Sequence, residues 1–232
     1  MKAVILAGGK GTRLRPYTAN LPKPLVKIGD KPIIEIIIRQ LASQNITDIM
    51  MAIGHLGEQI IGFCGDGSRF GVNIKYSQED EPLGTAGGLD LMRTDLNETF
   101  LMINGDTLTS LKYDALMNYH KDHQAMATIA LKGRQVYIDF GVVELDGEGF
   151  VGGYTEKPSI DYLVSMGVYV FEPKALEYIK SGERLDFPDL IKRLLANGEK
   201  VKGFNFDGYW LDIGRPEDYE RANEEIGSME EI

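Results

Sequence analysis

The sequence predicts an α/β fold in which a doubly wound, mixed but mostly parallel sheet is flanked by helices, in the Rossmann-like manner. Short aliphatic runs recur along the first half of the chain, and stretches with helical periodicity separate them. The 232 residues, 43% of them hydrophobic, are also enough to bury a complete core. Ligands bind such a sheet at the carboxyl ends of its strands. The residues that follow each strand are therefore the first candidates for a site.

Four aliphatic runs in the first half are expected to form strands, at residues 2–6, 49–53, 72–76 and 100–103. Asp30 and Pro32 indicate the start of a helix, as capping residue and first-turn proline, and an apolar stripe follows from Ile33 to Leu41. A second helix is expected around residues 58–63. Thr85 is expected to cap a third helix, which continues to about residue 92.

The second half is more irregular, and its strands are expected to insert a further β layer rather than form a separate domain. Residues 141–145 and 152–155 are expected to pair as a hairpin. A strand at 168–171, helices at 173–180 and 187–196 and a strand at 201–206 follow. Pro216 and Glu217 indicate the start of the last helix. We therefore expect a single domain over residues 1–232, with functional halves of about 1–110 and 111–232.

Composition limits the classes of function. The formal charge of −10 and the pI of about 4.9 argue against a general nucleic-acid binder, which needs a basic surface. Cys64 is the only cysteine, which excludes an intramolecular disulfide and a Cys-rich zinc site. Glycine and charge begin directly after Leu6, so neither a signal peptide nor a membrane span is expected at the N-terminus. A cytoplasmic protein that binds no membrane is expected.

The turn after the first strand is the strongest candidate for a binding site. Three glycines there permit positive φ angles and a close approach of backbone N–H groups to an anion, and four cations surround them in an acidic chain. A turn without a ligand is the alternative, because neither the P-loop pattern nor the dinucleotide fingerprint is present. The combination predicts a polyphosphate site. Its residues are Gly8, Gly9, Gly11, Lys10, Arg13, Arg15 and Lys23.

Two later stretches place polar groups near strand ends. Asp106 follows the strand at 100–103, where a carboxylate could hold Mg²⁺ against phosphate oxygens. Turn chemistry explains Asn-Gly-Asp equally well. The polar, glycine-rich stretch from Gln78 to Gly88 is, on composition alone, better interpreted as a surface connection.

Taken together, these segments resemble the sugar-phosphate nucleotidylyltransferases, also called nucleoside-diphosphate-sugar pyrophosphorylases. The resemblance covers nearly the whole chain in order. EPLGTAGG is most similar to the mannose-1-phosphate and heptose-1-phosphate guanylyltransferases, whereas GDGSRFG (65–71) also resembles N-acetylmuramate-1-phosphate uridylyltransferases. The matching segments are GGKGTRLRP (8–16), PKP (22–24), EPLGTAGG (81–88), NGD (104–106), EKP (156–158) and WLDIGRPEDY (210–219).

The resemblance implies that a sugar 1-phosphate oxygen attacks the α-phosphorus of an NTP, which gives an NDP-sugar and pyrophosphate. Two polyanions must meet, so catalysis should rest on charge neutralisation and positioning. By similarity, Arg13 holds the triphosphate, Lys23 neutralises the α-phosphate and the developing pyrophosphate, and Lys157 grips the sugar phosphate. Asp106 and Asp212 would ligate one Mg²⁺.

The resemblance also assigns binding residues to the two halves. It implies that the inserted β layer binds sugar, through Gly141, Glu156 and Ser165. We expect GTP to be the favoured nucleotide, because residues 78–85 offer hydrogen-bond partners to the guanine edge. A mannose- or manno-heptose-type 1-phosphate is the favoured acceptor. The nucleotide-binding residues are Leu6, Ala7, Gly8, Gly9, Gly11, Thr12, Gln78, Gly84 and Thr85.

Several alternatives stay open. Ser165-Met166-Gly167 stands where many members of the family have Asn-x-Gly, so the sugar is not determined. A uridylyl- or cytidylyltransferase for another sugar 1-phosphate, such as N-acetylmuramate or glucose 1-phosphate, is the first alternative. The second is a non-catalytic nucleotide-sugar sensor, against which the retained Arg13, Lys23 and Lys157 argue. No C-terminal hexapeptide-repeat domain is expected, and a homo-oligomer is possible.

Overall fold

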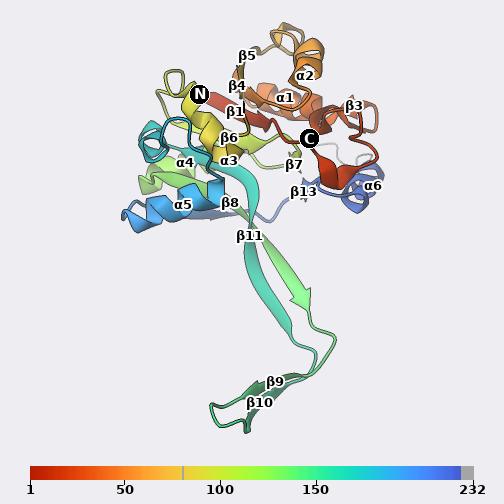
Figure 1. The fold of residues 1–232 in the computed structure, drawn as a ribbon, viewed down its shortest axis with the longest axis vertical. Coiled ribbons are helices and arrows are strands. Elements are labelled where there is room, and N and C mark those ends of the chain that lie inside the picture. The colour runs from red at the N-terminus through yellow and green to blue at the C-terminus, as the bar shows by residue number, and fades with distance from the viewer. Residues whose placement is uncertain (80, 226–232) are drawn as a thin grey trace.

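A seven-stranded sheet forms the centre of the structure, a computed structural model that describes residues 1–79 and 81–225 (Figure 1). The strands lie in the order β12-β8-β11-β6-β1-β4-β5. All are parallel except β11, which runs antiparallel to both its neighbours. The predicted mixed, mostly parallel α/β fold is thereby confirmed. The strands are β1 (Lys2–Ala7), β4 (Asp48–Ile53), β5 (Asn73–Gln78), β6 (Phe100–Asn104), β8 (Ala127–Tyr137), β11 (Ser159–Phe171) and β12 (Val201–Asn205).

Helices cover both faces of this sheet, because successive strand residues point to opposite sides. Helices α1, α2, α4 and α6 contribute buried residues to the core on one face, and α3 and α5 contribute to the core on the other. The helices are α1 (Ile33–Ser43), α2 (Gly57–Cys64), α3 (Gly84–Gly87), α4 (Tyr113–His123), α5 (Phe187–Ala196) and α6 (Pro216–Glu225). Short 3-10 turns lie at Thr12–Leu14, Lys23–Leu25, Ser68–Phe70, Gly88–Met92 and Pro173–Tyr178.

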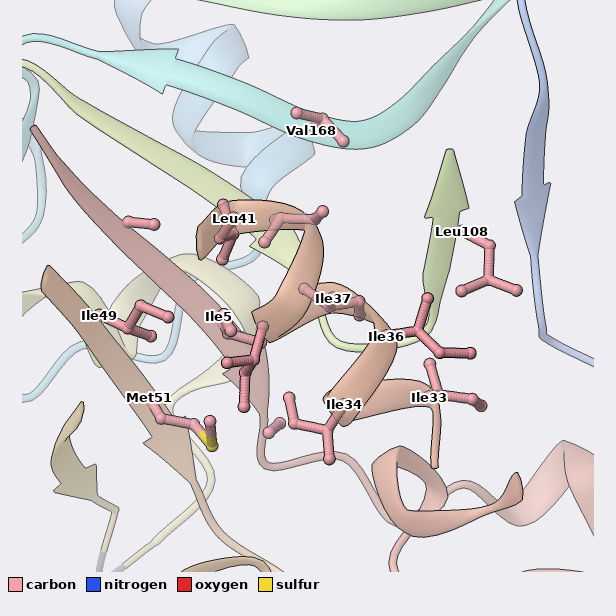
Figure 2. Packing of buried hydrophobic residues seen from close by; sticks show 14 of the residues in the cluster. Ile5, Ile33, Ile34, Ile36, Ile37, Leu41, Ile49, Met51, Leu108 and Val168 are labelled. Atoms are coloured by element: carbon pink, nitrogen blue, oxygen red, sulfur yellow. The ribbon is translucent and has the colours of Figure 1, made fainter. Parts of the chain in front are cut away.

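Helix α1 shows how the sequence builds the first of these cores. The predicted apolar stripe is buried, with Ile37 and Leu41 at most 1% exposed. Figure 2 shows side chains of α1 in the same cluster as Ile5 of β1 and Ile49 of β4. The packing fixes α1 against β1 and β4, whose carboxyl ends carry the loops described below.

The starts of two helices differ from the prediction. Asp30 does not cap α1; Pro32 occupies the N-cap position, and β3 (Lys31–Pro32) pairs with β2 (Lys27–Ile28) just before the helix. Thr85 does not cap its own helix either, because α3 begins after Leu83 without a side-chain cap. The Thr85 hydroxyl instead accepts a hydrogen bond from the backbone N–H of Phe187, at 2.9 Å. It therefore caps α5, a hundred residues further along the chain.

Two strands of three residues each extend the structure beyond the end of β6. β7 (Thr107–Thr109) pairs antiparallel with β13 (Trp210–Asp212), with Thr107 opposite Asp212. The backbone N–H of Ile213 also donates to the carbonyl of Asp106, at 3.0 Å. This pairing brings a segment from late in the chain to the carboxyl end of a central strand.

The strands of the second half were expected to add a further layer, but β12 and parts of β8 and β11 belong to the central sheet itself, and the remainder projects from it. β8 and β11 run on past the sheet as a two-stranded arm, with a register shift between Ser165 and Tyr169 (Figure 1). β9 (Val142–Leu145) and β10 (Val151–Thr155) form the predicted hairpin at its tip. The arm, residues 132–164, exposes large apolar side chains: Val136, Tyr137, Phe140, Val143, Leu145, Phe150, Val151, Tyr154, Ile160, Tyr162 and Leu163.

None of the helices within residues 1–79 and 81–225 combines the length and the apolar character that a membrane crossing requires.

Candidate functional site

A cleft of about 490 Å³ opens at the carboxyl ends of the central strands. Most of the residues that the sequence analysis selected line this cleft. They come from the loop after β1, from residues 84–85 and from the two aspartates. The predicted residues that line it are Leu6, Ala7, Gly8, Gly9, Gly11, Thr12, Arg13, Lys23, Gly84, Thr85, Asp106 and Asp212. Those absent from its lining are Arg15, Gln78, Gly141, Glu156, Lys157 and Ser165.

The loop after β1 forms one wall of the cleft and is packed tightly at Gly11. Gly11 has a φ of 59°, a left-handed conformation that favours glycine. A Cβ at this position would lie 3.1 Å from the Cβ of Lys23 and 3.2 Å from Cγ2 of Thr18. The Thr18 hydroxyl donates to the Gly11 carbonyl at 2.7 Å, which holds the turn. The glycine therefore lets the loop lie directly on the segment that carries Lys23.

Lys23 and Asp106 form an ion pair at the floor of the cleft. Nζ of Lys23 lies 2.5 Å from Oδ2 of Asp106, and Lys23 is only 8% exposed. The other oxygen of Asp106, Oδ1, is buried and has no hydrogen-bond partner among the described residues. An ionised carboxylate oxygen rarely lies buried without a partner, so this atom is a candidate ligand for a cation.

Asp212 reaches the same floor from β13. Its pKa is raised to about 6, first by burial and then by the negative charge of Asp106, while Lys23 and Arg13 act in the opposite direction. Two carboxylates that repel each other in a partly buried place indicate a site that stabilises positive charge. Arg13 itself is exposed at the entrance.

The donor set fits Mg²⁺. Within the described part of the chain no group of three or more His, Cys, Asp or Glu side chains is placed to hold a metal ion, and magnesium usually takes one or two carboxylates and completes its shell with water and substrate phosphates. A cation held by Asp106 and Asp212 would give Oδ1 of Asp106 its missing partner. It would also offset the repulsion that raises the pKa of Asp212.

The opposite rim contains two carboxylates that the sequence analysis did not select. Glu79 lines the cleft, where burial raises its pKa, and its Oε2 accepts a hydrogen bond from the N–H of Leu83 at 3.0 Å. Asp186 accepts from the N–H of Thr85 at 2.9 Å. Residues of the segment 78–85 do line the cleft, but Gln78, the side chain selected at its start, is exposed at the end of β5 and lies outside the lining. Asp80, in the same segment, lies outside the described residues.

Lys10, Asn104 and Gly214 also line the cleft. Lys10 had been counted among the cations of the first loop, and Asn104 belongs to the NGD motif. Asp186 carries no local signal of this kind, because only the pairing of distant segments brings it to the rim.

Three of the residues expected to hold the sugar or its phosphate lie on the arm, and the fourth, Ser165, lies at its base. Glu156 and Lys157 are exposed in the connection between β10 and β11, where Oε2 of Glu156 accepts a hydrogen bond from the hydroxyl of Tyr154 at 2.9 Å. Gly141 lies just before β9 and packs against the same tyrosine. Ser165 stands at the register shift where the arm leaves the sheet, and its hydroxyl donates to that of Tyr169 at 2.7 Å.

Sequence comparison relates the chain to proteins of known activity. A family model described as nucleotidyl transferase matches residues 2–228. A UTP–glucose-1-phosphate uridylyltransferase from Synechocystis sp. is 36% identical over 249 residues, which cover 99% of this chain and 64% of that protein. A mannose-1-phosphate guanyltransferase from Schizosaccharomyces pombe is 36% identical over 231 residues, which cover 94% and 62%. The chain thus spans less than two thirds of the length of these curated relatives.

Comparison of structures gives the same relationship. A crystal structure from Bacillus anthracis, provisionally named glucose-1-phosphate thymidylyltransferase and in complex with sucrose, superposes with a TM-score of 0.78 at 29% sequence identity. The match covers 97% of this chain and 94% of that one. The likeness therefore extends over both halves of the chain.

Proposed function

Because the chain belongs to the nucleotidyl transferase family, we propose that it transfers a nucleotidyl group from a nucleoside triphosphate to a sugar 1-phosphate. The products are a nucleoside-diphosphate sugar and pyrophosphate. The observation that carries the proposal is the juxtaposition of the glycine loop, Lys23 and the pair Asp106 and Asp212 in one cleft. Loop N–H groups and cations suit a polyphosphate, and the carboxylate pair suits the metal that accompanies it.

The proposed reaction requires that the protein position the two substrates and neutralise their charge, and it does not require a covalent nucleophile. A phosphate oxygen of the sugar 1-phosphate forms a bond to the α-phosphorus, and the bond from that phosphorus to the bridging oxygen of the β-phosphate breaks. The attacking oxygen is already ionised, so no general base is needed. Arg13 at the entrance and Lys23 at the floor would neutralise the triphosphate and the departing pyrophosphate.

Mg²⁺ held by Asp106 and Asp212 would supply further positive charge at the phosphate oxygens. Before any substrate binds, Lys23 already occupies Oδ2 of Asp106. The lysine is thereby kept at the floor of the cleft, where an incoming phosphate can share its charge.

We propose that the nucleotide is GTP. Glu79 presents a carboxylate at the rim, and the guanine edge offers two adjacent donors, N1–H and N2–H₂, that a carboxylate accepts. Uracil and thymine flank their single N3–H with two carbonyl oxygens, which a carboxylate repels, and cytosine has an acceptor at N3. A mannose- or manno-heptose-type 1-phosphate is the proposed acceptor, and the fission yeast relative, named as a mannose-1-phosphate guanyltransferase, supports this assignment.

A uridylyltransferase is the second candidate, because the cyanobacterial relative carries that name together with glucose 1-phosphate and matches 99% of this chain. The two candidates differ in nucleotide and in sugar, so one assay can separate them.

The test is a screen of pyrophosphate release with Mg²⁺, in which GTP, UTP, CTP and dTTP are each combined with a panel of sugar 1-phosphates. We expect GTP to be preferred by roughly tenfold or more, the discrimination that one or two hydrogen bonds provide. Equal or faster turnover with UTP and glucose 1-phosphate would support the second candidate. Tight nucleotide binding without pyrophosphate release in any combination would instead indicate a sensor.

A further inference from the structure

The cleft and the residues proposed to hold the sugar phosphate lie in different parts of the chain. The cleft's lining contains no residue of the arm. Glu156 and Lys157 lie near the arm's tip, next to β10, and Figure 1 shows that tip far from the carboxyl end of β1. A single chain in this conformation therefore has a triphosphate half of the site but no sugar-phosphate half.

Contacts at its base fix the direction of the arm. Nζ of Lys132 donates to the carbonyls of Asp207 and Gly208, at 2.6 and 2.8 Å. The guanidinium of Arg134 lies over the ring of Trp210, 5.1 Å from its centre. β8 and β11 are also continuous with the central sheet. Bending the arm back onto its own cleft would break these contacts, so the arm is built to point away from its own body.

The arm exposes the kind of large apolar side chains that are usually buried in a protein core or an interface. Eleven of the fifteen large apolar side chains that are exposed among the described residues lie within it, and Phe140, Phe150 and Tyr154 are each at least 65% exposed. Soluble monomers rarely expose large apolar patches, and the arm concentrates most of the large exposed apolar side chains of the described residues in one element. Five of the eleven are aromatic, and each aromatic can bury about 150–250 Å². The set is therefore of the order of the ~800 Å² per partner that a stable interface needs.

Charge complements this surface. From residue 138 to residue 155 the arm contains four acidic residues and no basic one, whereas residues 8–24 contain four basic residues and no acidic one. The tip of one chain can thus approach the entrance of a cleft in another with favourable electrostatics.

We propose that two copies of this chain exchange their arms, so that Glu156 and Lys157 of each copy complete the sugar-phosphate half of the other copy's cleft. Such an exchange is isologous and closes with twofold symmetry. It covers both arms and completes both sites at once. The inference rests on the proposed function and on the sugar-phosphate role that the family resemblance implies for Lys157, but its test distinguishes the arm exchange from the proposed function.

The test is complementation between two inactive variants. Lys157→Ala and Asp212→Asn chains are co-expressed with different tags, and the mixed dimer is purified through both tags in succession. In an exchanged dimer one cleft combines an intact floor with an intact arm, and the other contains both defects. We expect about half of the wild-type rate per dimer, while each variant alone is nearly inactive.

The matched control pairs Asp106→Asn with Asp212→Asn. Both changes lie in the cleft, so neither subunit has an intact floor and no activity should return. Recovery in this control would show that the subunits exchange in another way and would overturn the assignment. A Lys157→Ala enzyme with wild-type turnover would also overturn it, because Lys157 would then not belong to the site.

A second measurement does not depend on those variants. Light scattering should give twice the 25.8 kDa chain mass, and Phe140→Ser with Phe150→Ser should shift the protein to monomers whose turnover per chain falls at least tenfold. An active monomer with concentration-independent turnover would show that each arm serves its own cleft. Wild-type protein that forms the dimer but releases no pyrophosphate with any substrate pair would contradict the proposed function while leaving the association itself established.

Discussion

At the floor of the cleft, a single lysine, Lys23, lies near two carboxylates, those of Asp106 and Asp212. Lys23 neutralises Asp106, yet the second oxygen of Asp106 is buried without a partner among residues 1–79 and 81–225, and the pKa of Asp212 is raised to about 6. One lysine is too little positive charge for two carboxylates in a partly buried place. The residues therefore favour a divalent cation, which we propose arrives with the nucleotide.

Asp106→Asn and Asp212→Asn are each expected to lower kcat by about 100-fold or more, because each removes a charge that holds the metal at the reacting phosphates. Excess EDTA should abolish turnover of the wild type. Pyrophosphate release measures both effects, and circular dichroism should show an unchanged fold. Asp122→Asn on the exposed side of α4 serves as the control and should be silent. Full turnover in EDTA would refute the metal site.

Arg13→Ala and Lys157→Ala are expected to fail on different substrates. Arg13 lines the cleft with the glycine loop, so its loss should weaken NTP binding. Lys157 lies on the arm, so its loss should raise KM for the sugar 1-phosphate by about tenfold or more, the usual effect of losing a charged hydrogen bond. Calorimetric titration with NTP should then give Lys157→Ala a nearly wild-type affinity. A loss as large as that of Arg13→Ala would show the division of roles to be wrong.

Glu79→Gln is expected to reduce the preference for GTP over UTP by about tenfold, because the neutral amide neither pairs with two guanine donors nor repels the uracil carbonyls. The ratio of kcat/KM for the two nucleotides is the measurement. Glu81→Gln, an exposed change two residues away and outside the lining, is the matched control. An unchanged ratio in Glu79→Gln would remove this residue from base recognition.

At the scale of elements, a buried histidine joins three parts of the second half. The imidazole of His120 on α4 hydrogen bonds through Nδ1 to the Thr128 hydroxyl of β8, at 2.8 Å, and through Nε2 to Glu172, at 3.0 Å. Burial lowers the pKa of His120, and Glu172 opposes that shift only in part. The folded protein therefore prefers the neutral ring.

The sign of the resulting pH dependence follows from linkage. Between the lowered pKa of the folded state and the ordinary value of about 6.5, the unfolded chain binds more protons, so stability rises with pH in that window. The stabilisation is complete above about pH 6.5 and is lost as the pH falls below it. Urea unfolding at pH 7.5 and 5.5 should show a smaller pH-dependent loss in His120→Gln than in the wild type. Equal losses would exclude His120 as the source.

Strongly periodic elements could be predicted from sequence because their pattern is local. The apolar stripe of α1 and the aliphatic run that becomes β1 are examples, since burial explains the apolar residues in them. β7 and β13 could not be predicted, because strands of three residues are stabilised by a partner about a hundred residues away. Thr85 is a residue type that often caps helices, but the residue type alone does not show which helix it caps. Gln78 rather than Glu79 was selected from the sequence. Which of two neighbouring side chains at a strand end faces the cleft depends on the conformation of the loop that follows, and the sequence does not show that conformation.

At the scale of the whole molecule, the two short strands expected at residues 141–145 and 152–155 predicted a hairpin but not its position. Pairing within a hairpin is local, whereas the direction of the arm depends on Lys132, Arg134 and their contacts with residues 207–210. The halves of the candidate site were therefore recognisable as motifs, and their separation in space was not.

Arm exchange would make thermal stability depend on protein concentration, since only the folded chains associate. With roughly 0.7 kcal/mol of unfolding enthalpy per residue, a tenfold rise in concentration should raise the Tm of the dimer by about 1–2 °C. Scanning calorimetry over two decades of concentration measures this. The variant with Phe140→Ser and Phe150→Ser should give a constant Tm. A constant Tm in the wild type as well would argue that the folded protein is not an obligate dimer.

The distance along the chain between the two carboxylates also sets an order of events during synthesis. Asp212 reaches Asp106 only when β13 pairs with β7, and at about 5–20 residues per second the ribosome needs several seconds to make the intervening segment. In that interval the nascent chain already contains the glycine loop, Lys23 and Asp106. Their ion pair would occupy the Asp106 carboxylate until Asp212, its proposed partner in holding a cation, is made, so that the growing chain would not present half of the proposed cation site.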